Sequence, residues 1–223
     1  MKKYKEQVPV EEKTRWYADI ESMEDRRTKE QIPNLLILEQ ASGVDPNEGE
    51  GERPARRIVY EGVDCIAEFV KDLTNGKTSP FLHSFIFFHN LGGYDGHFVA
   101  AELMERALKF NQVMRGQRFL SITVPSVDVE FRDTLLYIPN TPLEALPGMY
   151  GLEGVRKGFF PHQLNRPKWA TPGERRAYES SKGFAGGRFP RPSSWKPQQM
   201  KPKKRREFAA WHEEQVREFR ADP

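Results

Sequence analysis

The sequence predicts an α/β fold, in which strands and helices interleave along the chain. Short runs rich in β-branched and aromatic residues alternate with segments whose apolar residues recur at helical spacing. The 223 residues, 37% of them hydrophobic, suffice for one substantial domain with a core. The 30% of charged residues indicates that polar extensions surround this core.

The first part of the chain opens on a predicted strand pair. Residues 14–22, "TRWYADIES", and 33–40, "PNLLILEQ", are the two strands, with a polar turn between them. Residues 41–57 are rich in Gly, Pro and charge, which is typical of a surface loop. A third strand is expected at 57–62, followed by an amphipathic helix over 63–73.

The central part begins with an apolar strand at 81–88. A Gly pair and Asp95 follow, and apolar residues at helical spacing then predict a helix. The runs "RFLSITV" (118–124) and "VDVEF" (127–131) alternate like two half-buried strands.

Beyond residue 140 the pattern weakens. "PLEALPGMYGL" predicts a short helix. Residues 161–204 are rich in Pro, Gly and basic residues and are not expected in the core. A last helix is expected at about 206–220. We therefore expect an extension at 1–14, a folded domain at 15–162, a connection at 163–204, and an incomplete unit with a C-terminal helix at 205–223.

Composition excludes several classes of protein. The single cysteine, Cys65, rules out an intrachain disulfide framework and a CxxC metal site, and it favours a reducing compartment. No apolar run reaches membrane-spanning length and the N-terminus lacks a signal-peptide core, so we expect a soluble, intracellular protein without membrane partners. The net charge of +3 identifies no partner. The basic run 196–206 is equally consistent with a solvated helix start and with phosphate contact or nuclear targeting.

Two acids on the first strand form a candidate metal site. Asp19 and Glu21 are two positions apart, so on a strand both carboxylates point to one face, where they suit Mg²⁺ or Mn²⁺. With 9 Asp and 23 Glu, about one Asp-x-Glu is expected by chance. A second one, Asp128-Val129-Glu130, is explained as the solvent-exposed face of a half-buried strand.

A second group of polar residues follows the buried strand 81–88. Asn90 and Asp95 are expected at the rim of the sheet, where open α/β sheets place their sites, and Asp95 would add a third carboxylate. The Gly pair lets the backbone turn sharply or lets a substrate strand approach closely. The alternative is that Asp95 only caps the following helix.

Four motifs in order, "YADIES", "FHNLGGYDGHF", "DTLLYIP" and "VRKGFFPH", resemble the exonuclease domain of protein-primed B-family DNA polymerases. The segments "IPNLLILEQ", "GVDCIAEF" and "MKPKKRREFAAWHEEQ" are most similar to the Maverick/Polinton-like and adenovirus-like branch. The resemblance covers about residues 15–220. It implies an RNase H-like mixed sheet flanked by helices, with an extended basic C-terminal segment, and a 3′-to-5′ proofreading exonuclease used in DNA replication.

The resemblance also implies roles for individual residues. The metal ligands would be Asp19, Glu21 and Asp95, holding two Mg²⁺ or Mn²⁺ ions that hydrolyse the terminal phosphodiester, with Lys157 supporting the site. Six residues would contact a single-stranded 3′ end, primer-template DNA or the priming terminal protein. These DNA-binding residues would be Asn90, Tyr94, Thr134, Leu135, Phe160 and His162.

One family motif is missing. No Tyr-x-x-x-Asp, the third exonuclease motif, follows the C-terminal helix, where the resemblance places it, and the one in the chain, Tyr60 to Asp64, lies before the second motif. We therefore expect a fragment, a partial reading frame or a decayed copy, without polymerase activity and with weak metal binding and little exonuclease activity. Two alternatives stay open: a non-catalytic module that binds single-stranded DNA or terminal protein, and a stand-alone nuclease that takes its fourth acid from Glu213, Glu214 or Asp222.

Overall fold

The computed structural model describes residues 9–25, 28–41, 56–152, 158–160, 189 and 191–221. The chain divides into two compact units. The first comprises Met1–Ser22 and Ile32–Leu143, and the second comprises Met23–Gln31 and Glu144–Pro223.

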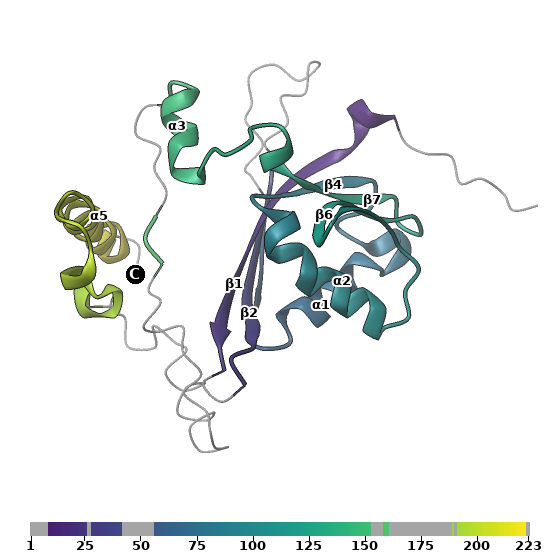
Figure 1. Ribbon diagram of the computed structural model, residues 1–223, viewed down its shortest axis with the longest axis horizontal. Coiled ribbons are helices and arrows are strands. Elements are labelled where there is room, and N and C mark those ends of the chain that lie inside the picture. Colours follow the sequence, from purple (N-terminus) through teal and green to yellow (C-terminus); the bar gives the residue numbers. More distant parts are fainter. Residues whose placement is uncertain are drawn as a thin grey trace, which may run out of the picture. The chain divides into compact units, whose positions relative to one another are not determined.

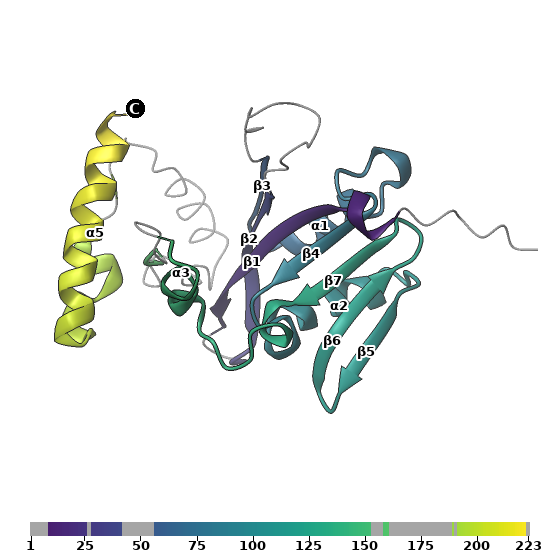
Figure 2. The same ribbon diagram turned by 90° about the horizontal axis from the view of Figure 1, so that it is seen from above.

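Seven strands among the described residues form one mixed sheet in the order β3-β2-β1-β4-β7-β6-β5 (Figures 1 and 2). β4 pairs in parallel with both β1 and β7, whereas the β2–β3, β5–β6 and β6–β7 pairs are antiparallel. The predicted α/β fold with a mixed sheet is therefore confirmed. The strands are β1 (Thr14–Glu24), β2 (Gln31–Gln40), β3 (Arg57–Glu61), β4 (Ser84–Phe88), β5 (Asn111–Arg115), β6 (Arg118–Val124) and β7 (Val129–Asp133).

Helices α1 (Cys65–Leu73) and α2 (Asp95–Glu105) share one core with the sheet. The core uses alternate residues of the central strands, as expected for strands with one buried face. α1 has a strongly amphipathic sequence, and its apolar residues Ile66, Phe69, Val70 and Leu73 are buried. The strand residues of this core include Trp16, Ile20, Leu36, Leu38, Ile86, Phe88, Ile122, Val124, Val129 and Phe131.

The sequence missed one strand and placed the starts of two others too early. All five residues of β5 are exposed, so this edge strand has no apolar alternation from which it could be predicted. β4 begins at Ser84, because residues 81–83 form a turn in which His83 has a left-handed backbone. β7 begins at Val129, because Asp128 also has a left-handed backbone (φ 52°) and belongs to the preceding turn.

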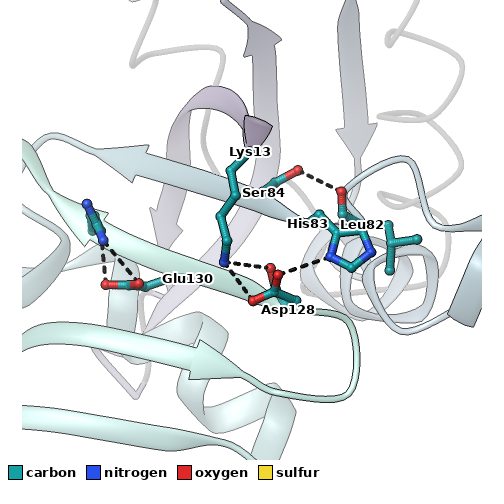
Figure 3. A network of polar contacts seen from close by, with 7 residues as sticks. Lys13, Leu82, His83, Ser84, Asp128 and Glu130 are labelled. Atoms are coloured by element: carbon teal, nitrogen blue, oxygen red, sulfur yellow. Dashed lines mark hydrogen bonds and ion pairs between the residues drawn. The ribbon is translucent and has the colours of Figure 1, made fainter. Parts of the chain in front are cut away.

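The turn before β7 is held by ion pairs (Figure 3). Asp128 Oδ1 lies 2.6 Å from Lys13 Nζ, and Asp128 Oδ2 lies 3.0 Å from His83 Nδ1. Glu130 pairs instead with Arg132, at 2.9 Å. The second Asp-x-Glu of the sequence is therefore explained by structural ion pairs, although Asp128 lies in a turn and not on the predicted strand face.

The second unit contains α3 (Leu146–Met149), two 3-10 turns (Pro192–Trp195 and Pro197–Gln199) and α5 (Pro202–Ala221). α5 confirms the predicted C-terminal helix and begins four residues earlier than expected. It packs into an aromatic cluster in which Trp195, within the segment not expected in the core, is 8% exposed. The other rings of this aromatic cluster are Phe159, Phe189, Phe208, Trp211 and Phe219. No described helix has the length and apolar character needed to cross a membrane.

Candidate active site at the ends of three parallel strands

Three neighbouring parallel strands, β1, β4 and β7, end at the same edge of the sheet. Asp19 and Glu21 lie on the last part of β1, Asn90 follows β4, and Asp133 ends β7. The carboxyl ends of parallel strands are where open α/β sheets bind ligands. The topology thus brings together the polar residues that the sequence singled out.

Asp95 is joined to the first strand by a direct hydrogen bond. β1 pairs with β4 only as far as Ala18 opposite Phe88, so the next backbone groups of β1 on that side have no strand partner in β4. The Ile20 N–H instead donates to Asp95 Oδ1 at 3.2 Å. Asp95 is therefore both the first residue of α2 and the acceptor that continues the edge of β1. The N-cap position of α2 is occupied by Tyr94, whose side chain forms no cap bond, and Asp95 is the first residue of the helix.

The electrostatics of Asp95 reflect its burial and its acidic neighbours. Asp95 is 4% exposed. Burial first, and then the negative charge of Asp19, raises the pKa of Asp95 to about 7, against the opposing effect of backbone N–H donors, including that of Ile20. Titratable groups with such displaced pKa values concentrate at functional sites.

Tyr94 lies within the same group of acids. Its hydroxyl is hydrogen-bonded to Ser22 Oγ on β1. Burial raises the pKa of Tyr94, the Ser22 hydrogen bond opposes this, and the charges of Asp95, Glu21 and Asp19 add to the rise. The three candidate metal ligands and Tyr94 are therefore close enough to affect one another.

The described residues provide an incomplete metal site. Among them, no three His, Cys, Asp or Glu side chains are arranged to hold a metal ion. Asp19 is exposed, Glu21 is half-buried, and one oxygen of Asp95 is bound to the β1 backbone. The carboxylates have the chemistry that Mg²⁺ or Mn²⁺ requires, but their arrangement fits such an ion only in part.

The turn after β4 depends on its two glycines. A Cβ at Gly92 would lie 2.4 Å from the Phe119 carbonyl oxygen, so the turn packs directly on the backbone of β6. A Cβ at Gly93 would lie 2.5 Å from Asn90 Oδ1, so the Asn90 amide occupies the space that a side chain would fill. The Gly pair therefore permits close approach of the protein's own backbone and the Asn90 side chain, and the approach of a substrate strand stays a prediction. Arg118 donates to Asn90 Oδ1 at 2.8 Å and fixes the orientation of this amide.

Thr134 and Leu135 follow β7, beside the same turn. Thr134 Oγ1 lies 2.9 Å from His89 Nδ1, and the pair links the ends of β4 and β7. The Leu135 N–H donates to Asp133 Oδ1 at 2.9 Å.

The sequence interpretation missed Asp133. This residue is 2% exposed and accepts two further backbone N–H bonds, from Asn90 to Oδ1 at 2.9 Å and from Gly92 to Oδ2 at 3.0 Å. One carboxylate thus ties the turn after β4 to the end of β7. The signal was its position directly before the Thr-Leu pair, at the end of an apolar strand, where a carboxylate can accept from nearby backbone N–H groups.

Other residues predicted for the site lie outside the described residues or in the second unit. Lys157, His162 and Asp222 lie outside the described residues. Phe160 is half-buried in the second unit, and Glu213 and Glu214 lie on α5 of that unit.

Comparison with known proteins finds a family that part of the chain resembles. Residues 82–182 match the model of the family described as DNA polymerase type B, organellar and viral. This segment is less than half of the chain, and over it the chain is similar to that family. The matched residues include the turn after β4, Asp95 and Asp133, and the predicted resemblance is confirmed at the level of the family.

Solved structures similar to this chain include phi29 DNA polymerase complexed with primer-template DNA and incoming nucleotides, at 16% identity and a TM-score of 0.51. Phi29 DNA polymerase complexed with single-stranded DNA matches at 14% identity and a TM-score of 0.50. Each match covers 74% of this chain and 28% of the phi29 chain, and at these identities it establishes the fold alone. No curated protein matches the chain.

Proposed function

We propose that this chain carries the 3′-to-5′ proofreading exonuclease region of a protein-primed type B DNA polymerase, in an RNase H-like fold. The observation that carries the proposal is the Ile20 N–H to Asp95 hydrogen bond, because it fixes the first acid of α2 against the strand that bears Asp19 and Glu21. Electrostatic coupling of Asp95 with Asp19 supports the same assignment. The complete polymerase, with its primer-template DNA and terminal protein, extends beyond the proposed region.

In this function Asp19, Glu21 and Asp95 would hold Mg²⁺ or Mn²⁺, and the metal would activate water and stabilise the leaving 3′ oxygen. Asn90 and Tyr94 would grip the unpaired 3′ end by amide contact and stacking, with little base readout. Thr134 and Leu135 adjoin the same turn and would contact the next nucleotides or the terminal protein. Lys157, Phe160 and His162 complete the proposed set, and the basic C-terminal segment would add phosphate contacts.

The test is Mn²⁺-dependent degradation of a 5′-labelled single-stranded oligonucleotide by the purified chain. Asp19→Asn is the informative variant, because Asp19 is exposed and its replacement should leave the fold intact. Changes to residues that only hydrogen-bond to a metal ligand already cost about 10- to 100-fold in activity, so loss of a direct ligand should cost at least about 100-fold. The matched control is Glu61→Gln, an exposed acid on β3 that should cut at the wild-type rate. Equal rates for Asp19→Asn and wild type would refute the metal assignment.

A second candidate function is a non-catalytic module that binds single-stranded DNA or terminal protein. The observation in its favour is the lack of a three-ligand metal group among the described residues. If the chain is such a module, the wild type and Asp19→Asn should bind the oligonucleotide with equal affinity, and neither should cut it.

A further inference from the structure

The hairpin formed by β5 and β6 has two arginines facing one another next to its turn. Arg115 and Arg118 are direct partners across the hairpin, and Gly116 supplies the left-handed residue of the turn (φ 61°). Directly opposed residues of an antiparallel pair project from the same face of the sheet. Both arginines are exposed.

This arrangement is unfavourable for the hairpin by itself. Like charges directly opposite one another destabilise a strand pair, and β5 buries no side chain that would offset the cost. The surrounding sequence offers no compensation, since residues 107–127 contain three Lys and Arg residues and no acid. A concentration of positive charge that the fold does not neutralise is typical of a surface that meets a polyanion.

The arginine pair is connected to the candidate site. Arg118 donates to Asn90 Oδ1 at 2.8 Å, and a Cβ at Gly92 would lie 3.4 Å from Arg118 Cβ. The positive hairpin tip therefore adjoins the turn that would hold the DNA end. The planar guanidinium has five N–H donors, so one bond to Asn90 uses only part of its capacity and leaves a geometry suited to phosphate.

We propose that the Arg115–Arg118 pair is a phosphate-binding surface that holds the single-stranded DNA as it enters the site at Asn90. Arg118 has two roles, because it binds phosphate and also positions the Asn90 amide. The inference rests on the proposed function, and it names the hairpin tip as a contact with the substrate strand outside the acidic centre.

The salt dependence of DNA binding tests the proposal. The probe is a fluorescein-labelled single-stranded oligothymidylate, and its anisotropy is followed without divalent metal at 50 and 200 mM NaCl. The slope of log K against log salt concentration is negative. For single strands, each lost phosphate contact makes this slope shallower by about 0.7, so the double variant Arg115→Gln, Arg118→Gln should have a slope shallower by about 1.4. The affinity advantage of the wild type should then shrink about sevenfold between the two salt concentrations.

The matched control is Lys71→Gln with Lys77→Gln, which removes the same charge from exposed positions on α1 and the following turn. This control should keep the wild-type slope. The melting temperature of the arginine double variant should not fall, because relief of the like-charge pair offsets the lost Asn90 contact. Arg118→Lys should retain the slope but lower the affinity, because it keeps the charge and loses the fork that orients Asn90.

Equal slopes for the wild type and the arginine double variant, or equal losses in the lysine control, would overturn the proposal. Retention of DNA binding with loss of binding to an acidic peptide would do the same, since the surface would then serve a protein partner. Failure of the exonuclease proposal is separate: it is seen as absent or Asp19-independent hydrolysis, whatever the slopes are.

Discussion

Replacement of Asp133 by Asn should destabilise the first unit more than its single changed atom suggests. The Asp133 carboxylate accepts three backbone N–H bonds at 2.9, 2.9 and 3.0 Å and is 2% exposed. An Asn side chain keeps one acceptor oxygen, which can serve the N–H groups of Asn90 and Leu135. Its amide nitrogen then faces the Gly92 N–H, so a buried donor is left without an acceptor.

The magnitude follows from these contacts. Hydrogen bonds to a charged group contribute about 1.5 to 3 kcal/mol and neutral ones about 0.5 to 1.5 kcal/mol, so the two retained bonds lose about 1 kcal/mol each. The unsatisfied Gly92 N–H costs about 1 to 3 kcal/mol. The repulsion between Asp133 and Asp95 contributes to the raised pKa of Asp95, and its removal offsets part of the lost stability. The net loss should be about 3 kcal/mol.

Urea unfolding followed by far-UV circular dichroism measures this loss. With a slope of about 2 kcal/mol/M, the midpoint should fall by about 1.5 M. Asp72→Asn is the control, because the Asp72 carboxylate accepts one bond, from the Tyr60 hydroxyl at 2.9 Å, that an amide oxygen can also accept. The control should lose less than about 1 kcal/mol. If both variants unfold at the same urea concentration, Asp133 does not hold the turn as the structure indicates.

Two further predictions concern the turn after β4 and the turn before β7. Gly93→Ala should displace the Asn90 amide. The affinity for single-stranded DNA should then fall about fivefold, the equivalent of one hydrogen bond, with little change in melting temperature. Unchanged binding would show that Asn90 makes no contact with the DNA. Asp128→Asn should cost about 1 kcal/mol at neutral pH. Burial raises the pKa of Asp128, but the hydrogen bonds and charges of Lys13 and His83 outweigh this and hold it below its usual value. The wild-type advantage should therefore persist above the unfolded-state pKa and disappear as the pH falls through the folded-state pKa, and a pH-independent difference in urea midpoints would contradict the ion-pair assignment.

Periodicity predicted the elements that bury one face. The first two strands, the helix at α1 and the helix that follows Asp95 all have apolar residues at the spacing of their element, so the sequence located them to within a few residues. The exposed edge strand β5 has no such pattern. It pairs with β6 through backbone hydrogen bonds, which side-chain spacing does not predict.

The candidate site was predictable where side-chain chemistry marks it and not where backbone geometry makes it. Asp19, Glu21, Asn90 and Asp95 were found as acids or amides near strand ends, and the parallel pairing of β1, β4 and β7 explains why these positions meet. The bond from Ile20 to Asp95 could not be predicted, because it depends on how far β1 extends beyond its pairing with β4.

The backbone bonds of Asp133 set it apart from the carboxylate that the third exonuclease motif would supply. Oδ1 accepts two N–H bonds and Oδ2 accepts one, so a metal could share Asp133 only through the remaining lone pair of Oδ2. Asp95 differs, because Oδ1 alone is bound to the neighbouring strand. Two buried acids at one sheet edge thus have separate tasks: Asp133 builds the turn, and Asp95 is the acid whose charge is coupled to Asp19. A change at Asp133 should therefore impair metal-dependent cutting and DNA binding together, through the turn, whereas Asp19→Asn should impair cutting alone.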